Sequence, residues 1–206
     1  LTEDEIFDRG RAERYLLLAR DLPGYDVRLT LKPAGTAPGD LIGEVTVQRA
    51  PLLIDASIQN LAARETGPWG GQMRAQFNGL TGLGDATSVS FYATSQFSEQ
   101  KLLQFTHEMR PGTEGLTLGG QLTFGWTKPD LNAPSGTAAL RADTLFATIE
   151  ASYPLIRSQA RNLRLAGGMD FLDQKVKLLV PLSRDKLRVA YLRADYDAID
   201  ISRPTA

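Results

Sequence analysis

The sequence lacks several features that mark common classes of protein. It contains no cysteine, so neither a disulfide nor a thiolate metal site can form. It has a single histidine, His107, and no run of about 18 apolar residues that would form a transmembrane helix. Its 23 basic and 24 acidic residues nearly balance, which gives no reason to expect a nucleic-acid partner.

The chain also contains no catalytic arrangement that we can identify. Gly82-Leu83-Gly84 looks like a phosphate-binding loop only superficially, because no helix follows it. We interpret it as a tight turn with positive-φ glycines. We interpret His107 as an interfacial residue and Glu108 as a polar strand residue. The sequence therefore predicts no enzyme activity, catalytic residue, metal, cofactor or small-molecule substrate.

Residues 1–49 indicate a small α+β unit. Thr2–Glu5 has the spacing of a capping box, and apolar residues between Ala12 and Ala19 follow the period of an amphipathic helix. Pro23-Gly24 should end this helix. Two alternating strands are then expected, at Asp26–Lys32 and Leu41–Gln48.

The first of these two strands is the candidate edge at which an extended peptide could dock. Backbone groups at a strand edge bind a peptide without requiring a particular sequence. The candidate docking residues are Asp26, Val27, Arg28, Leu29, Thr30, Leu31 and Lys32.

From Pro51 onward the sequence predicts strands and no helix. We expect eight strands of about ten residues, the length that crosses a bilayer at a tilt. They are expected at 52–61, 69–78, 86–96, 102–110, 116–127, 145–154, 162–172 and 186–197. The clearest is 116–127, which has leucine and aromatic residues on one face and Thr, Gly and Gln on the other.

This alternation is compatible with a soluble β-sandwich or with a transmembrane barrel. The connections at 79–85, 110–115 and 155–161 are short and the one at 128–143 is long, as in barrels with short periplasmic turns. Aromatic residues at the alternate strand positions that would face outward would form a belt at the lipid interfaces. They are Trp69 and Trp126 at the long-loop end and Tyr153 at the short-turn end.

Polar residues on the opposite faces of these strands would line a lumen. They are Gln72, Arg74, Gln76, Gln121, Thr123, Glu150, Arg164 and Asp170. The charged members can pair across the wall or be solvated, and we favour a structural role. A role in conducting a substrate would require them to face an open pore.

Four local signatures stand in the same order as in one known family. They are Arg11–Leu18 with Asp21–Gly24, Gly79–Asp85, Tyr153–Leu163, and Lys186–Asp197. They resemble, in turn, the helix of the second POTRA domain, two periplasmic turns and the eighth barrel strand of two-partner secretion transporters (the TpsB family). These transporters export haemolysins and filamentous-haemagglutinin-like adhesins.

The resemblance implies a mainly β fold in two parts. Residues 1–49 would be the C-terminal part of a POTRA domain, and residues 50–206 the N-terminal half of a transmembrane antiparallel β-barrel. The family has two POTRA domains, sixteen barrel strands, a plug helix and an inward loop, of which this sequence holds only a portion. Because the sequence also starts at Leu1, without Met or signal peptide, we expect a fragment or a processed product.

The resemblance further implies a function in export. The chain would belong to an outer-membrane transporter that moves a partner exoprotein from the periplasm to the cell surface, with its N-terminal part in the periplasm. Its partners would be the secreted protein and outer-membrane lipid. The alternatives are an assembly factor of the BamA type and a soluble β-rich binding or adhesin module.

Overall fold

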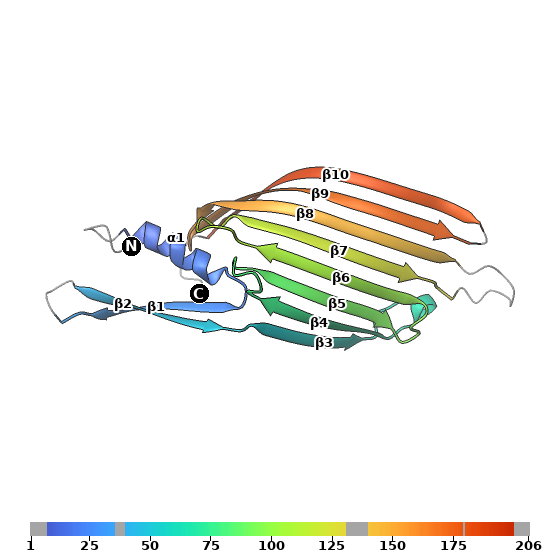
Figure 1. Ribbon diagram of the computed structural model, residues 1–206, viewed down its shortest axis with the longest axis horizontal. Coiled ribbons are helices and arrows are strands. Elements are labelled where there is room, and N and C mark those ends of the chain that lie inside the picture. The colour runs from blue at the N-terminus through green and yellow to red at the C-terminus, as the bar shows by residue number, and fades with distance from the viewer. Residues whose placement is uncertain (1–7, 36–39, 131–139, 179, 200–206) are drawn as a thin grey trace.

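A computed structural model describes residues 8–35, 40–130, 140–178 and 180–199 of the chain. One α-helix and a two-stranded hairpin precede an eight-stranded sheet (Figure 1). Among the described residues, no helix is long and apolar enough to cross a membrane.

Helix α1 runs from Arg9 to Arg20. Asp8 caps its N-terminus, because its carboxylate accepts hydrogen bonds from the backbone amides of Gly10 and Arg11. The helix ends before Pro23-Gly24, as predicted, and Gly24 has a φ of 73°. The predicted capping box at Thr2–Glu5 lies outside the described residues.

The predicted hairpin is confirmed. Strand β1 (Tyr25–Pro33) pairs antiparallel with β2 (Leu41–Arg49), and Val27, Leu29 and Leu31 lie on the same face as Val45 and Val47. Helix α1 packs against β1, where Val27 is buried, whereas all of β2 is exposed. That residues 1–49 form part of a POTRA domain stays a prediction.

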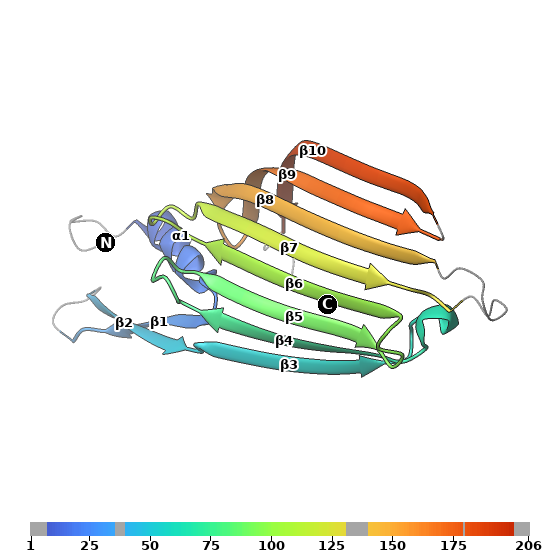
Figure 2. The ribbon, with the colours of Figure 1, turned by 45° about the vertical axis from the view of Figure 1, so that its right-hand side comes forward.

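The eight predicted strands are all present and pair in chain order to form one antiparallel sheet. Their bounds are β3 Leu52–Gln59, β4 Gly70–Asn78, β5 Ala86–Thr94, β6 Gln100–Met109, β7 Thr117–Thr127, β8 Arg141–Arg157, β9 Arg161–Lys177 and β10 Pro181–Ala198. The sheet curves, most strongly at β8, β9 and β10 (Figure 2), and within the described residues β3 and β10 do not pair with each other.

The expected length of about ten residues is wrong for the last three strands. Strands β8, β9 and β10 contain 17, 17 and 18 residues. Much of the additional length lies toward the long-connection end, where charged residues such as Asp173, Lys175 and Lys177 replace apolar ones. Hydrogen bonding to the neighbouring strands continues there, although the apolar alternation that predicted the strands has ended.

The connection between β4 and β5 is the tight turn that the glycines predict. Gly79, Gly82 and Gly84 have φ values of 75°, 79° and 62°. Asp85 is fully buried, and its carboxylate accepts hydrogen bonds from the Leu80 and Thr81 amides and from the Thr81 hydroxyl. Burial alone would raise the pKa of Asp85, but these hydrogen bonds outweigh it and hold the pKa below its ordinary value.

Helix α1 lies across the end of the sheet that carries the three short turns (Figure 1). Leu22 packs over Gly84 in the β4–β5 turn, and Leu18 over Gly115 in the β6–β7 turn, where an added Cβ would lie 2.7 Å and 2.5 Å from the leucine Cδ2 atoms. In the β6–β7 turn, Glu114 also accepts a 2.7 Å hydrogen bond from the Tyr15 hydroxyl.

The third turn, between β8 and β9, is held to α1 by polar contacts. The Arg157 guanidinium donates two hydrogen bonds to the Asp21 carboxylate, at 2.8 Å and 2.7 Å, in a two-point ion pair. The backbone N–H of Gln159 donates a 2.7 Å hydrogen bond to the Glu13 carboxylate. Helix α1 and the two residues after it, Asp21 and Leu22, therefore contact all three turns and fix the hairpin relative to the sheet.

We predict that Arg157→Gln loosens α1 from the sheet without unfolding the sheet. Losing the two-point ion pair should weaken docking by about 1–2 kcal/mol, because each charged hydrogen bond is only partly exposed. Hydrogen exchange of the α1 amides should become faster. Arg161→Gln is the control, since this nearby exposed side chain forms no ion pair within the described part of the chain. Equal exchange in the two variants would contradict the assigned role of Asp21–Arg157.

Candidate functional site: two faces of one sheet

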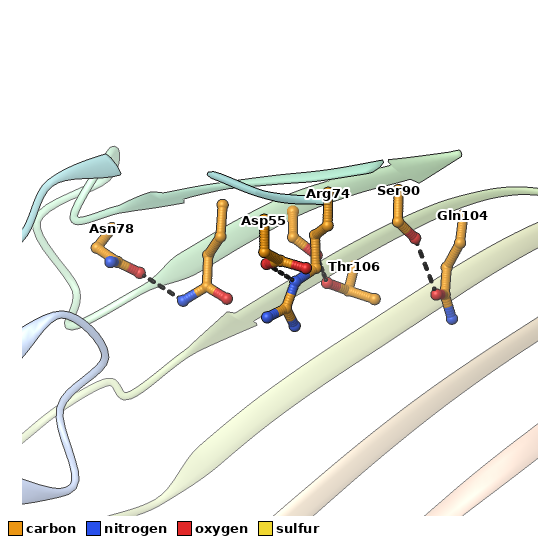
Figure 3. A network of polar contacts seen from close by, with 8 residues as sticks. Asp55, Arg74, Asn78, Ser90, Gln104 and Thr106 are labelled. Carbon is orange, nitrogen blue, oxygen red and sulfur yellow. Dashed lines mark hydrogen bonds and ion pairs between the residues drawn. The ribbon is translucent and has the colours of Figure 1, made fainter. Parts of the chain in front are cut away.

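One face of the eight-stranded sheet is polar across its first strands. Arg74 on β4 donates a 2.8 Å hydrogen bond to Asp55 on β3, within an ion pair. Ser88 lies 2.6 Å from the Thr106 hydroxyl, and Ser90 donates to Gln104 at 3.2 Å. These side chains project from the same face (Figure 3).

The polar face continues across the later strands. The Tyr191 hydroxyl on β10 donates a 2.7 Å hydrogen bond to Glu150 on β8, and Arg193 lies 3.5 Å from the same carboxylate. One open hollow is lined by residues from β4 to β10, including Gln72, Gln121 and Tyr191. Side chains separated by six strand-to-strand steps share this hollow, so the polar face is the concave face of the sheet.

All eight residues predicted to line a lumen lie on this concave face. The register pairs Arg74 with Ser90, Thr148 with Asp170, and Arg164 with Asp195, which fixes their common side. Arg74 and Glu150 are in ion pairs, whereas Arg164 and Asp170 form none with any residue that the structure describes. That this face lines a pore stays a prediction.

Sequence reasoning missed the partners of these charges. Asp55 was not identified as the partner of Arg74, nor Tyr191 and Arg193 as the partners of Glu150. The alternation of Tyr191, Arg193 and Asp195 along the last strand was the available signal. The pairing itself needed the register between strands.

The opposite, convex face is apolar and uncovered. Exposed hydrophobic side chains follow it from strand to strand. They include Ile54, Ile58, Met73, Phe77, Phe91, Phe105, Ile149, Met169 and Leu192. Among the described residues, the buried hydrophobic ones are only Ala12, Val27, Ala86 and Ala166. The accessible surface is 14372 Å², against roughly 9,500 Å² for a compact soluble protein of this mass.

The aromatic residues predicted at the lipid interfaces lie on or beside this convex face. Trp126 stacks on Phe124 with ring centroids 6.1 Å apart, and its side chain is exposed. Trp69, exposed, directly precedes β4 at the same end of the sheet, and Tyr153 lies on β8 near the short turns, partly buried. The strand register also places His107 on the convex face, where its Nδ1 lies 2.8 Å from the Thr87 hydroxyl. Contact of these residues with lipid stays a prediction.

The exposed apolar side chains of the convex face form a band, the apolar band, that crosses the face obliquely. It covers Leu52–Ile58 on β3 and Ala190–Tyr196 on β10. Leu52 lies at the short-turn end of the band on β3, and Ala190 lies at its long-connection end on β10. The register connects these two residues across seven strand-to-strand steps. The band therefore shifts by six residues along the strands between β3 and β10. With a rise of ~3.3 Å per residue and ~4.8 Å between strands, the strands tilt by roughly 30–35° relative to the band. Transmembrane barrels have strand tilts of ~35–45°.

The predicted docking residues Asp26–Lys32 lie in β1. Arg28 forms an ion pair with Asp26 at 2.7 Å, and Lys32 forms one with Glu44 on β2. Leu31, Leu41, Val45 and Val47 are exposed on the apolar face of the hairpin. Within the described residues β1 pairs only with β2, which leaves one long side of each strand without a strand partner.

Comparison with known proteins supports the fold. The chain is similar to the structure of CdiB from Escherichia coli, with a TM-score of 0.74 and 18% identity over 90% of this chain and 35% of that one. It is also similar to CdiB from Acinetobacter baumannii, with a TM-score of 0.63 and 16% identity over 96% of this chain and 41% of that one. A structure of BamA from Haemophilus ducreyi lacking POTRA domains 1-3 has a TM-score of 0.49, with 11% identity over 94% of this chain and 37% of that one.

No family model matches the sequence, and no curated protein matches it. The chain spans between about a third and two fifths of the length of the solved structures it matches. The fold class is therefore mainly β, an antiparallel sheet similar to that of the β-barrel CdiB, and the sheet is not closed within the residues that the structure describes.

We predict that Phe124→Arg and Thr123→Arg have unequal effects on folding in lipid vesicles. Phe124 lies on the convex face, so an arginine there should cost roughly 2–4 kcal/mol near the middle of a bilayer. Thr123, one residue away, lies on the concave face and should tolerate arginine. Folded fractions can be measured by the heat-dependent mobility of the reconstituted protein in gels. Equal destabilisation would contradict the assignment of the two faces.

Proposed function

We propose that the chain is part of an outer-membrane β-barrel transporter that exports a partner protein from the periplasm to the cell surface. The observation that carries the proposal is the oblique apolar band on an uncovered convex face, opposite a concave face lined with polar side chains. A bilayer would cover the band, and the concave face would form the wall of a hydrated path. The proposed role is not enzymatic.

The membrane part of the proposal follows from hydrogen bonding and surface area. Each inner strand of the sheet pairs with both neighbours, so its backbone groups need no water. An apolar face of this extent is unfavourable in water unless another surface covers it. In the proposed orientation, α1 and the β1–β2 hairpin lie in the periplasm, next to the short turns.

The export part of the proposal rests on the motifs and on the comparisons. The four signatures resemble TpsB transporters, and CdiB, to which the chain is structurally similar, is a TpsB protein. A substrate arriving in the periplasm would add as a strand to a free edge of the hairpin. An assembly factor of the BamA type is the runner-up, but the Asp21–Gly24 motif favours secretion. The surface area disfavours a soluble module.

We predict that the protein requires detergent or lipid to remain dispersed. The uncovered convex face should drive association in plain buffer, which size-exclusion chromatography with and without detergent can measure. A folded monomer in plain buffer would rule out the membrane role.

We further predict that one proline substitution in the hairpin blocks export without preventing barrel insertion. The bonds from Ala34 to Asp40 and from Ala50 to Gly24 show that the even-numbered residues form the hydrogen-bonded pairs of this hairpin. Leu31→Pro on β1 therefore removes a backbone donor that points away from β2, and Val45→Pro on β2 removes one that points away from β1. On the strand that receives substrate, an outward-pointing donor can be lost while the hairpin survives. Secretion of the partner should then fall while the amount of inserted protein stays normal.

The matched controls for this experiment are Leu31→Thr and Val45→Thr, which keep the backbone N–H. Limited proteolysis of the hairpin separates a docking defect from misfolding, because a disrupted hairpin is cut faster. If both proline variants keep an intact hairpin and normal secretion, the substrate does not dock by strand addition at these positions.

A further inference from the structure

A group of basic residues lies on the convex face beyond the apolar band, at the end of the sheet opposite to α1. It consists of Arg141, Lys175, Lys177, Arg184, Lys186 and Arg188, which we call the basic rim. All six side chains are exposed. Two acidic residues, Asp143 and Asp173, share the same face, so the rim carries a clear excess of positive charge.

The strand register brings like charges of the rim face to face. Arg141 is paired with Lys177, and Lys175 with Arg184. Cβ atoms of directly opposite residues lie ~4.5–5.5 Å apart, and like charges at that separation destabilise a sheet. Such pairs are tolerated at lower cost when an anion lies between or above them.

The two acidic residues neutralise the rim only in part. Lys175 lies opposite Asp143, and Lys186 lies opposite Asp173. Arg184 forms an ion pair with Asp173 at 3.4 Å. Within the described part of the chain, Lys175, Lys177 and Lys186 form no ion pair or hydrogen bond with another side chain. Three ammonium groups are therefore available to an external ligand.

The rim begins at the boundary of the apolar band. The Arg188 guanidinium lies 5.4 Å from the centre of the Phe171 ring, the last apolar residue of β9 on this face. An arginine whose chain lies along an aromatic ring and whose charge is at the edge of an apolar band is typical of an anchor at a lipid interface. The ligand must therefore carry negative charge immediately above a hydrocarbon layer.

The height of the rim distinguishes between kinds of lipid. From Arg188 to Arg184 is four residues, or ~13 Å along the strand and roughly 11 Å along the bilayer normal at the tilt derived above. The headgroup layer of a phospholipid leaflet is only about 5–8 Å deep. Cations at successive heights fit an amphiphile that carries phosphates at more than one level.

We propose that the basic rim binds the phosphates of a multiply phosphorylated glycolipid in the outer leaflet of the membrane. The inference rests on the proposed function, since it requires the convex face to lie in a bilayer with the long-connection end outward. Lys175 and Arg184 would contact one phosphate between them, and Lys186 and Arg188 another closer to the hydrocarbon. The lipid would fasten β8, β9 and β10 to one another where they extend beyond the apolar band.

The test uses the full-length protein in phosphatidylcholine nanodiscs containing bis-phosphorylated lipid A as the probe. Native mass spectrometry measures how much lipid A stays bound. The double variant Lys175→Gln/Lys186→Gln removes two exposed charges that form no hydrogen bond or ion pair with another described side chain, so the fold should persist. Since each basic residue near an anionic surface contributes about 1 kcal/mol, we expect retention to fall about tenfold or more.

The matched control is Arg9→Gln/Arg161→Gln, which removes two exposed charges at the other end of the molecule and should retain lipid A as the unmodified protein does. Dephosphorylated lipid A should bind the unmodified protein no better than it binds the double variant. Equal retention of lipid A by both proteins would overturn the inference, as would equal retention of phosphatidylglycerol and lipid A. A protein that fails to insert into any bilayer would instead contradict the proposed function itself.

Discussion

Backbone pairing from strand to strand is the constraint on which the rest of this structure depends. Neighbouring side chains in a strand point to opposite faces, so a slip of one residue anywhere would exchange the two faces from that strand onward. The ladder from β3 to β10 is continuous, with irregularities only near Pro154 and near Pro181. The same register produces the polar concave face, the apolar convex face and the oblique course of the band between them.

The strands were predictable because one of their faces is apolar along about ten residues. Where that alternation gives way to charge, as at Asp173–Lys177, the sequence no longer distinguishes a strand from a loop, and the lengths of β8, β9 and β10 were underestimated. The face on which each polar residue lies followed from its odd or even position along its strand. Partners such as Asp55 for Arg74 depend on register between strands, which parity within one strand does not define.

The docking of α1 was beyond sequence reasoning for a related reason. The helix itself was evident from the period of its apolar residues. Its contacts, however, join residues far apart in the chain, such as Asp21 with Arg157 and Tyr15 with Glu114. These contacts come from single residues in or beside three separate turns. The sequence of each turn accounts for its own conformation and gives no sign that a helix packs on it. Only the assembled sheet brings the three turns into one line.

That line of turns has a mechanical consequence. A sheet of paired strands bends easily about axes parallel to the strands. The turns at one end of such a sheet can therefore move relative to one another, one hairpin at a time. Helix α1 and the Asp21-Leu22 segment after it contact the connections of three hairpins, β4–β5, β6–β7 and β8–β9. Bending between these hairpins would have to break those contacts. A force applied to the β1–β2 hairpin would therefore be shared among the six strands from β4 to β9.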